Sequence, residues 1–154
     1  MSDHVKTLAE LGFLPAQIET IERFMNSIES GMIVIGGLTN SGTTTTATSI
    51  AALGARTGMA IAWNDDVVDE NTAQEAIETT VRASRNGTRA LVLATIHSNE
   101  IANIPLRLKL ISRMDNIDEL LADGTLRVLL IQQSLDHSAS TGWRLVAEVA
   151  EMQQ

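Results

Sequence analysis

Cysteine is absent from this chain, and aromatic residues make up only 3% of it. Without cysteine there is no disulfide framework, no thiolate metal site and no thiol nucleophile, which fits a reducing compartment. Because aromatic side chains are scarce, the core has to be aliphatic, built from the Ile, Leu, Val, Ala and Met that dominate the 44% of hydrophobic residues.

Long hydrophobic runs are absent as well. The first ten residues, MSDHVKTLAE, contain no apolar signal core, and no run approaches the ~20 apolar residues of a membrane span. We therefore expect a cytoplasmic protein without a membrane-inserted segment. This expectation leaves peripheral association with a membrane apparatus open.

Positive charge is the third scarcity. The chain has 11 Lys and Arg residues against 19 Asp and Glu residues, a formal net charge of −8. Direct binding of nucleic acid requires basic side chains that neutralise backbone phosphates, so nucleic acid is not an expected partner. The 154 residues contain no internal repeat, low-complexity tract or linker. A single domain over residues 1–154 is therefore predicted.

The most informative stretch that is present is GLTNSGTT, Gly37–Thr44, which follows the apolar run Met32–Ile35. A short β-branched run bounded by glycine predicts a buried strand, and Thr45–Arg56 is predicted to be a helix. Strand, glycine-bearing loop and helix are the context of the phosphate-binding pattern G-x-x-x-x-G-K-[ST]. Both glycines and the hydroxyl residue, Thr44, match the pattern, whereas Thr43 stands at its lysine position.

The missing lysine limits what this loop can do. Backbone N–H groups around Gly42, and a helix N-terminus carrying roughly +0.5 of a charge, attract phosphate without it. A hydrogen bond to a charged group is worth about 1.5–3 kcal/mol, so its loss should weaken nucleotide binding by roughly ten- to a hundred-fold and slow hydrolysis further. The only lysines, Lys6 and Lys109, are distant from the loop in sequence, and we expect neither to substitute. The alternative is a plain turn without a ligand.

A second apolar run, Met59–Trp63, ends in an acidic cluster. The cluster consists of Asp65, Asp66, Asp69 and Glu70. Carboxylates at the end of a strand are where phosphate-loop proteins hold Mg²⁺ and polarise water. The alternative, which the composition favours, is helix capping, with Asn71 and Gln74 forming a capping box.

A third strand is predicted over Arg89–Ile96, and His97 follows it. Open α/β sheets bind ligands at the carboxyl ends of their strands, so His97 is a candidate site residue. The alternative is that this lone histidine only forms hydrogen bonds within a loop.

The remaining segments complete the predicted fold. Helices are expected over Val5–Leu11, from Pro15 to a stop at Ser30-Gly31, around Ile101–Ile111, and from Asn116, paired with Glu119, to Ala122. The tail is predicted to be a β-hairpin, Thr125–Leu135 with Trp143–Val149, whose exposed turn contains His137. Together these elements predict an α/β fold with a mostly parallel sheet flanked by helices and a C-terminal β-hairpin.

Four segments, in this order, resemble the traffic ATPases of type II secretion, type IV pilus and conjugation systems, nearest the pilus-retraction branch. They are GLTNSGTTTT, the acidic stretch DDVVDENTAQEAI, the strand and histidine of LVLATIHSNE, and the closing segments RVLLIQQSL and GWRLVAEV. They are similar to the family's phosphate-binding loop, Walker B region, His box and paired closing strands. The resemblance covers most of the chain from Leu11 onward and implies a RecA-like P-loop NTPase core.

The resemblance also assigns site residues. It implies nucleotide and phosphate contacts from Gly37, Asn40, Ser41, Gly42, Thr43, Thr44 and Thr45, and catalytic positions at Asp66 and His97. Thr44 and Asp66 would face Mg²⁺, and Asp66 also the attacking water. ATP and Mg²⁺ are the implied cofactors, expected to bind weakly and not to be required.

Several departures from the family pattern bear on function. Thr43 replaces the loop lysine, Asp66 the Walker B glutamate and Val68 an arginine. The stretch between loop and Walker B region is shorter by several tens of residues, which removes a strand and the acidic Asp box. The family's N-terminal PAS-like domain, which helps to build the hexamer, is not found in this sequence.

These departures predict a degenerate, truncated relative of the motors that does not hydrolyse ATP. It would act through protein–protein contacts or by regulating an intact motor, as a homo-oligomer or in a hetero-assembly with a full-length motor ATPase. The first alternative is an ATP-binding domain with weak residual ATPase activity that powers pilus or secretion machinery. The second is a folded or self-associating module without a site.

Overall fold

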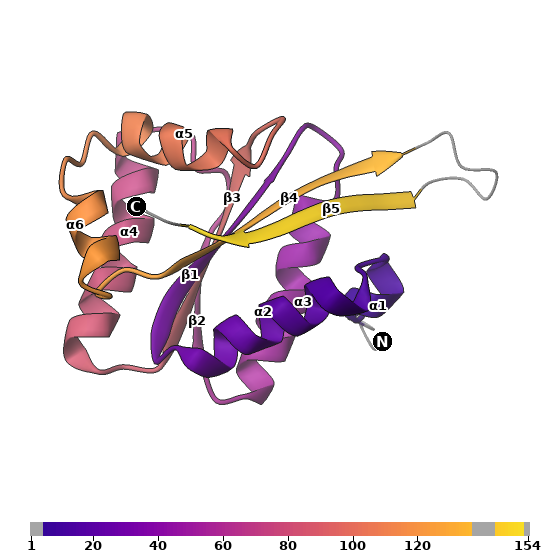
Figure 1. The fold of residues 1–154 in the computed structure, drawn as a ribbon, viewed down its shortest axis with the longest axis horizontal. Coiled ribbons are helices and arrows are strands. Elements are labelled where there is room, and N and C mark those ends of the chain that lie inside the picture. The colour runs from indigo at the N-terminus through magenta and orange to yellow at the C-terminus, as the bar shows by residue number, and fades with distance from the viewer. Residues whose placement is uncertain (1–4, 137–143, 153–154) are drawn as a thin grey trace.

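Strand β1 (Ser30–Gly37) lies at the centre of a five-stranded sheet in the computed structural model of this chain, which describes residues 5–136 and 144–152. The strand order is β2-β3-β1-β4-β5, with β2 at Ala60–Asn64, β3 at Ala90–His97, β4 at Val128–Asp136 and β5 at Arg144–Glu151. β1 to β4 are parallel, and β5 is antiparallel to β4 (Figure 1). The predicted fold class is confirmed; the hairpin turn with His137 lies outside the described residues.

Every residue of β1 is buried, which explains why its sequence is continuously apolar and does not alternate. Met32 and Val34 belong to one hydrophobic cluster, and Ile33 and Ile35 to a second. Because successive side chains of a strand lie on opposite faces, the two clusters occupy the two faces of the sheet.

Helices cover both faces of this sheet (Figure 1). The cluster around Ile33 receives side chains from α1 (Leu8–Leu11), α2 (Pro15–Ser27) and α3 (Thr43–Arg56). The cluster around Met32 receives them from α4 (Glu70–Asn86), α5 (Asn103–Ser112) and α6 (Ile117–Ala122). No helix in the described part of the chain has the length and hydropathy needed to cross a membrane.

The boundary between α2 and β1 differs from the prediction. Pro15 is the first residue of α2, as expected, but the helix ends at Ser27. Ser30-Gly31 is already part of β1. The strand extends this far because the Glu29 carbonyl accepts the Ala90 N–H at 3.0 Å, which continues the ladder toward the helix.

The two short helices α1 and α6 begin differently. α1 begins after Thr7 and not at Val5, because the Thr7 hydroxyl accepts the Glu10 N–H at 3.1 Å. α6 has the expected bounds with Asn116 at its N-cap position. The expected side-chain cap is wrong, because Asn116 makes no such bond within the described residues.

The start of α4 also corrects the predicted capping box. Its caps are Asp69 and Thr72: Asp69 Oδ1 accepts the Thr72 N–H at 2.8 Å, and the Thr72 hydroxyl accepts the Asp69 N–H at 3.1 Å. The bond from the Thr72 N–H, and after it the bond from the Thr72 hydroxyl to Asp69 Oδ1 at 3.0 Å, hold the pKa of the Asp69 carboxyl below its usual value. Asn71 lies inside the helix, and Gln74 instead donates to the Ser112 carbonyl at 2.8 Å, joining α4 to α5.

Replacing Asp69 by alanine should lower the melting temperature at about pH 7 by about 2–4 °C, because α4 loses its N-cap. The folded-state pKa of Asp69 lies below the ordinary value of 3.8. Its contribution is therefore complete above that pH and is lost as the pH falls through the folded-state pKa. Thermal melts over this range should show the two proteins converging in acid. Asp65→Ala removes an exposed acid of the same cluster and is the control; an equal loss there contradicts the assignment.

Candidate phosphate-binding site

The loop that joins Gly37, the last residue of β1, to the start of α3 turns through left-handed residues. Asn40 and Gly42 have left-handed conformations, with φ of 64° and 82°. The Ser41 N–H donates to the carbonyl three residues earlier at 3.1 Å, and α3 begins directly after Gly42. Left-handed residues next to right-handed ones turn successive N–H groups toward a common concave side, which favours anions. The predicted strand, loop and helix are present.

Two glycines at the tip of β1 permit close approach on both faces of the sheet. A Cβ at Gly37 would lie 2.1 Å from the Oγ of Ser41, so the loop folds directly over the end of the strand. On the other face, a Cβ at Gly36 would lie 2.7 Å from Gln132 Oε1 and 2.8 Å from Ile104 Cδ1. The first glycine of the loop pattern is therefore required for space.

The N-terminus of α3 presents N–H groups without acceptors in the helix. The Thr46 N–H donates to the Gly42 carbonyl at 3.1 Å, and no side chain of the described residues caps this end. The N–H groups of Thr43, Thr44 and Thr45 precede that bond and have no intrahelical acceptor. Thr44 and Thr45 are also exposed. These donors and the helix dipole together favour an anion at this position.

Two adjacent glutamines of β4 hold this region, and the sequence prediction gave them no role. Gln133 Nε2 donates to the Ser41 carbonyl at 2.8 Å. Gln132 Nε2 donates to the Ser98 carbonyl at 2.8 Å, and the Ser98 N–H donates to the Gly37 carbonyl at 3.2 Å. Both glutamines are buried. The available signal was a pair of polar residues inside the apolar strand sequence VLLIQQSL.

Some buried polar atoms on the loop and on β4 have no partner. Ser41 is 5% exposed and Gln133 is 2% exposed. Within the described residues, neither Ser41 Oγ nor Gln133 Oε1 makes a hydrogen bond, and Gln132 Oε1 makes none either. Buried polar groups in folded proteins are nearly always paired. Ser41 Oγ, in the loop before α3, is the one of these atoms that could donate a hydrogen bond to a ligand or to water.

Asp66 and His97 lie at the same edge of the sheet as the loop. His97 ends β3 in register with Gly37 of β1. Asp66 follows β2, and its N–H donates to Thr95 Oγ1 at 2.8 Å. Because β3 separates β2 from β1, the Asp66 backbone lies two strand spacings, ~10 Å, from β1. Both side chains are exposed. Asp66 and His97 therefore share an edge of the sheet with the loop but come from separate strands, whereas the predicted phosphate-binding residues Gly37–Thr45 lie in one segment.

ATP and Mg²⁺, the groups that the resemblance implies, fit this edge to different degrees. The free N–H groups and the unpaired Ser41 hydroxyl suit phosphate oxygens. The described residues contain no group of three or more His, Asp or Glu side chains able to hold a metal ion by themselves. Mg²⁺ would depend on phosphate oxygens and water, with Thr44 and Asp66 as protein ligands.

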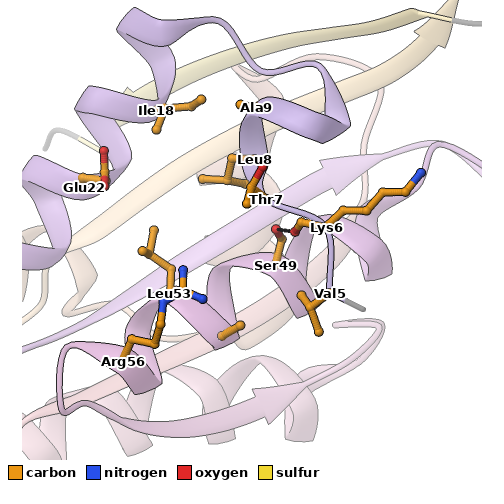
Figure 2. Close-up of a pocket in the computed structure, with 11 residues that line it drawn as sticks. Val5, Lys6, Thr7, Leu8, Ala9, Ile18, Glu22, Ser49, Leu53 and Arg56 are labelled. Atoms are coloured by element: carbon orange, nitrogen blue, oxygen red, sulfur yellow. Dashed lines mark hydrogen bonds between the residues drawn. The ribbon is translucent and has the colours of Figure 1, made fainter. Parts of the chain in front are cut away.

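One of the two lysines lies near the loop in space. Lys6 lines a cavity of about 270 Å³ together with Gly42, Thr45 and Gln133. Ser49 on α3 donates a hydrogen bond from its hydroxyl to the Lys6 carbonyl (Figure 2). Although Lys6 is distant from the loop in sequence, it therefore lies beside the N-terminus of α3.

Among known proteins, no family profile and no curated sequence matches this chain. Solved structures do match. The ATPase DotB of Legionella pneumophila has a TM-score of 0.68 and 16% identity, over 94% of this chain and 50% of DotB. DotB of Yersinia pseudotuberculosis has a TM-score of 0.65 and 17% identity, over 96% of this chain and 48% of that protein. The pilus retraction motor PilT, solved with bound ADP, has a TM-score of 0.63 and 17% identity, over 100% of this chain and 55% of PilT.

These similarities confirm the fold that the resemblance implied. The chain has the α/β core of secretion and pilus motor ATPases, and at 16–17% identity the matches establish the fold alone. The chain spans about half the length of each of these three proteins.

Replacing Gln133 by alanine should lower the free energy of unfolding by about 1–3 kcal/mol, because the Ser41 carbonyl loses its buried donor. Urea denaturation measures this loss. Ser134→Ala, at the exposed neighbouring position of β4, is the matched control and should change stability by less than about 0.5 kcal/mol. If the two variants are equally stable, the glutamine does not hold the loop.

Proposed function

We propose that this chain is a non-hydrolysing, ATPase-like domain related to secretion and type IV pilus motors, which binds nucleoside phosphates weakly and acts through protein–protein contacts. The observation that carries the proposal is a glycine-bearing loop, with left-handed residues at Asn40 and Gly42, that leads directly into α3 and has Thr43 where the phosphate-binding pattern has lysine. Such a loop retains N–H donors for phosphate. It lacks the side chain that stabilises the phosphoryl group during transfer.

The carboxyl edge of the sheet supports the loss of hydrolysis. Asp66 would have to activate water from a strand ~10 Å away from β1, with a side chain one methylene shorter than glutamate. Val68, which stands where the resembled family has an arginine, is apolar and 67% exposed. Hydrolysis requires water, base and phosphate within hydrogen-bond reach of one another, and the exposed position of the Asp66 side chain favours binding without turnover.

A role through contacts is the second part of the proposal. Leu106 and Leu110 are 56% and 67% exposed and lie four residues apart on α5, so they share one side of that helix. Leu38 in the loop is 50% exposed. We propose association with further copies of this chain or with a full-length motor ATPase, in the cytoplasm and at a pilus, secretion or conjugation apparatus.

A second candidate function is an ATP-binding domain with weak residual ATPase activity that powers the same machinery. One observation favours it, namely that Lys6 lies beside the loop in the cavity shared with Gly42 and Thr45. The two candidates differ in a single measurable property, the turnover of ATP.

The purified chain with Mg²⁺-ATP should release phosphate no faster than its Thr44→Ala variant, because neither protein has a cation at position 43. A phosphate-release assay measures the rate. Thr44 is exposed, so its replacement leaves the core unchanged and serves as the matched control. Turnover that disappears in Thr44→Ala would reject the non-hydrolysing function and favour the second candidate.

Nucleotide binding has its own test in thermal melts with Mg²⁺-ADP. A ligand present at a hundred times its Kd adds about 2.7 kcal/mol of stability, so the melting temperature should rise with nucleotide concentration in the millimolar range. Thr44→Ala should show a smaller rise. An unchanged melting temperature at all concentrations would contradict nucleotide binding and leave a folded module without this site.

A further inference from the structure

A cation that the loop lacks in its own sequence lies next to it in space. Lys6 precedes α1 and lines the cavity of about 270 Å³ that Gly42 and Thr45 also line at the start of α3. Of the described residues around this cavity, Lys6 is the one with an ionisable side chain. Its ammonium group is therefore the local source of positive charge for anything bound there.

The backbone of Lys6 is fixed to the helix that begins at the loop. Its carbonyl accepts the hydrogen bond from the Ser49 hydroxyl on α3. The next residue, Thr7, caps α1, and Leu8 is 4% exposed in the cluster that contains Ile50 of α3. The backbone of Lys6 is thus held at a defined position beside α3.

The direction and reach of the side chain match the position of the loop. Ser49 lies four residues beyond Thr45, a rise of ~6 Å along the helix axis, which is close to the length of an extended four-carbon lysine stem. Figure 2 shows the Lys6 side chain extended and pointing away from Leu53 and Arg56, which lie further along α3. The ammonium group therefore extends toward the N-terminal end of α3.

A second, independent observation indicates a ligand at this place. Gln133 lines the same cavity, is 2% exposed and has no hydrogen-bond partner for its Oε1 among the described residues. Ser41, whose carbonyl Gln133 holds, has an unpaired buried hydroxyl. Of these two groups, the Ser41 hydroxyl can donate to a phosphate oxygen, whereas Gln133 Oε1 is an acceptor and can pair only with a hydroxyl group of the ligand or with water.

We infer that Lys6 supplies the positive charge that Thr43 does not, and that Lys6 and the loop together bind the phosphate groups of a nucleoside diphosphate or triphosphate. The inference rests on the nucleotide binding proposed above, and it names Lys6 as the residue whose charge the binding needs. The net charge of −8 disfavours the approach of a polyphosphate. A local ammonium group with three donors offsets the negative potential of the chain near the N-terminus of α3.

Calorimetry with Mg²⁺-ADP as the probe tests the role of Lys6. Lys6→Met should raise Kd by roughly ten- to a hundred-fold relative to the unchanged chain, because a charge-assisted contact is lost. Lys109→Met is the matched control, since Lys109 lies on α5 and pairs with Asp118 at 2.8 Å. The control should leave Kd within about twofold, and Lys6→Arg should retain binding because it keeps the charge.

A charge-rescue cycle separates the role of Lys6 from general electrostatics. Thr43→Lys should restore binding in the Lys6→Met background and improve it far less in the unchanged chain, because there a cation is already present. The Ser49 hydroxyl bonds to the main-chain carbonyl of residue 6. This bond does not depend on the side chain at position 6, so the melting temperatures of the variants should agree. This comparison shows that the loss of binding is not a loss of folding.

The outcomes distinguish the two proposals. If the unchanged chain does not bind Mg²⁺-ADP at millimolar concentration, the proposed nucleotide binding fails and the role of Lys6 fails with it. If the unchanged chain binds and Lys6→Met binds equally well, or Lys109→Met loses as much, only the role of Lys6 is overturned. Equal gains from Thr43→Lys in both backgrounds overturn it as well.

Discussion

The placement of the tip of β1 between β3 and β4 is the constraint on which the rest of the molecule depends. The strand is buried throughout, so its direction is fixed by hydrophobic packing on both faces. Gln133 and Gln132 of β4 then transmit that position to the loop through the carbonyls of Ser41 and Ser98. The conformation of the loop is consequently set by the sheet as well as by the loop's own residues.

The fold was predictable because its signals are local. A continuous apolar run marks β1, Pro15 marks the start of α2, and the strand–loop–helix order marks the candidate site. The cap of α4 was misplaced because Asp69 and Asn71 have similar capping propensities, and only the backbone shows that Asp69 is the extended residue before the helix while Asn71 is already helical. The sequence could not place Lys6 beside the loop, because that proximity depends on a bond between residues 43 positions apart.

Binding and hydrolysis separate naturally in this architecture. In the proposed site, main-chain N–H groups and the dipole of α3 would attract an anion, and both depend on backbone shape alone. Turnover depends in addition on side chains that meet at the edge of the sheet, where Asp66 and His97 are exposed and come from different strands. A chain can lose the catalytic side chains and keep the main-chain donors, because the packing of the sheet maintains the backbone without those side chains. The charge at the phosphate can then come from another element.

Gly36 and Gly37 give the tip of β1 a further property. Their absent side chains face opposite sides of the sheet, with Gln132 and Ile104 beside one and Ser41 beside the other. The end of the strand therefore separates the loop on one face of the sheet from α5 on the other. A methyl group at Gly37 would meet Ser41 directly, whereas one at Gly36 would meet Ile104 and also Gln132 and Ser98, which are bonded to the strand end, so neither glycine can be replaced without disturbing the base of the loop.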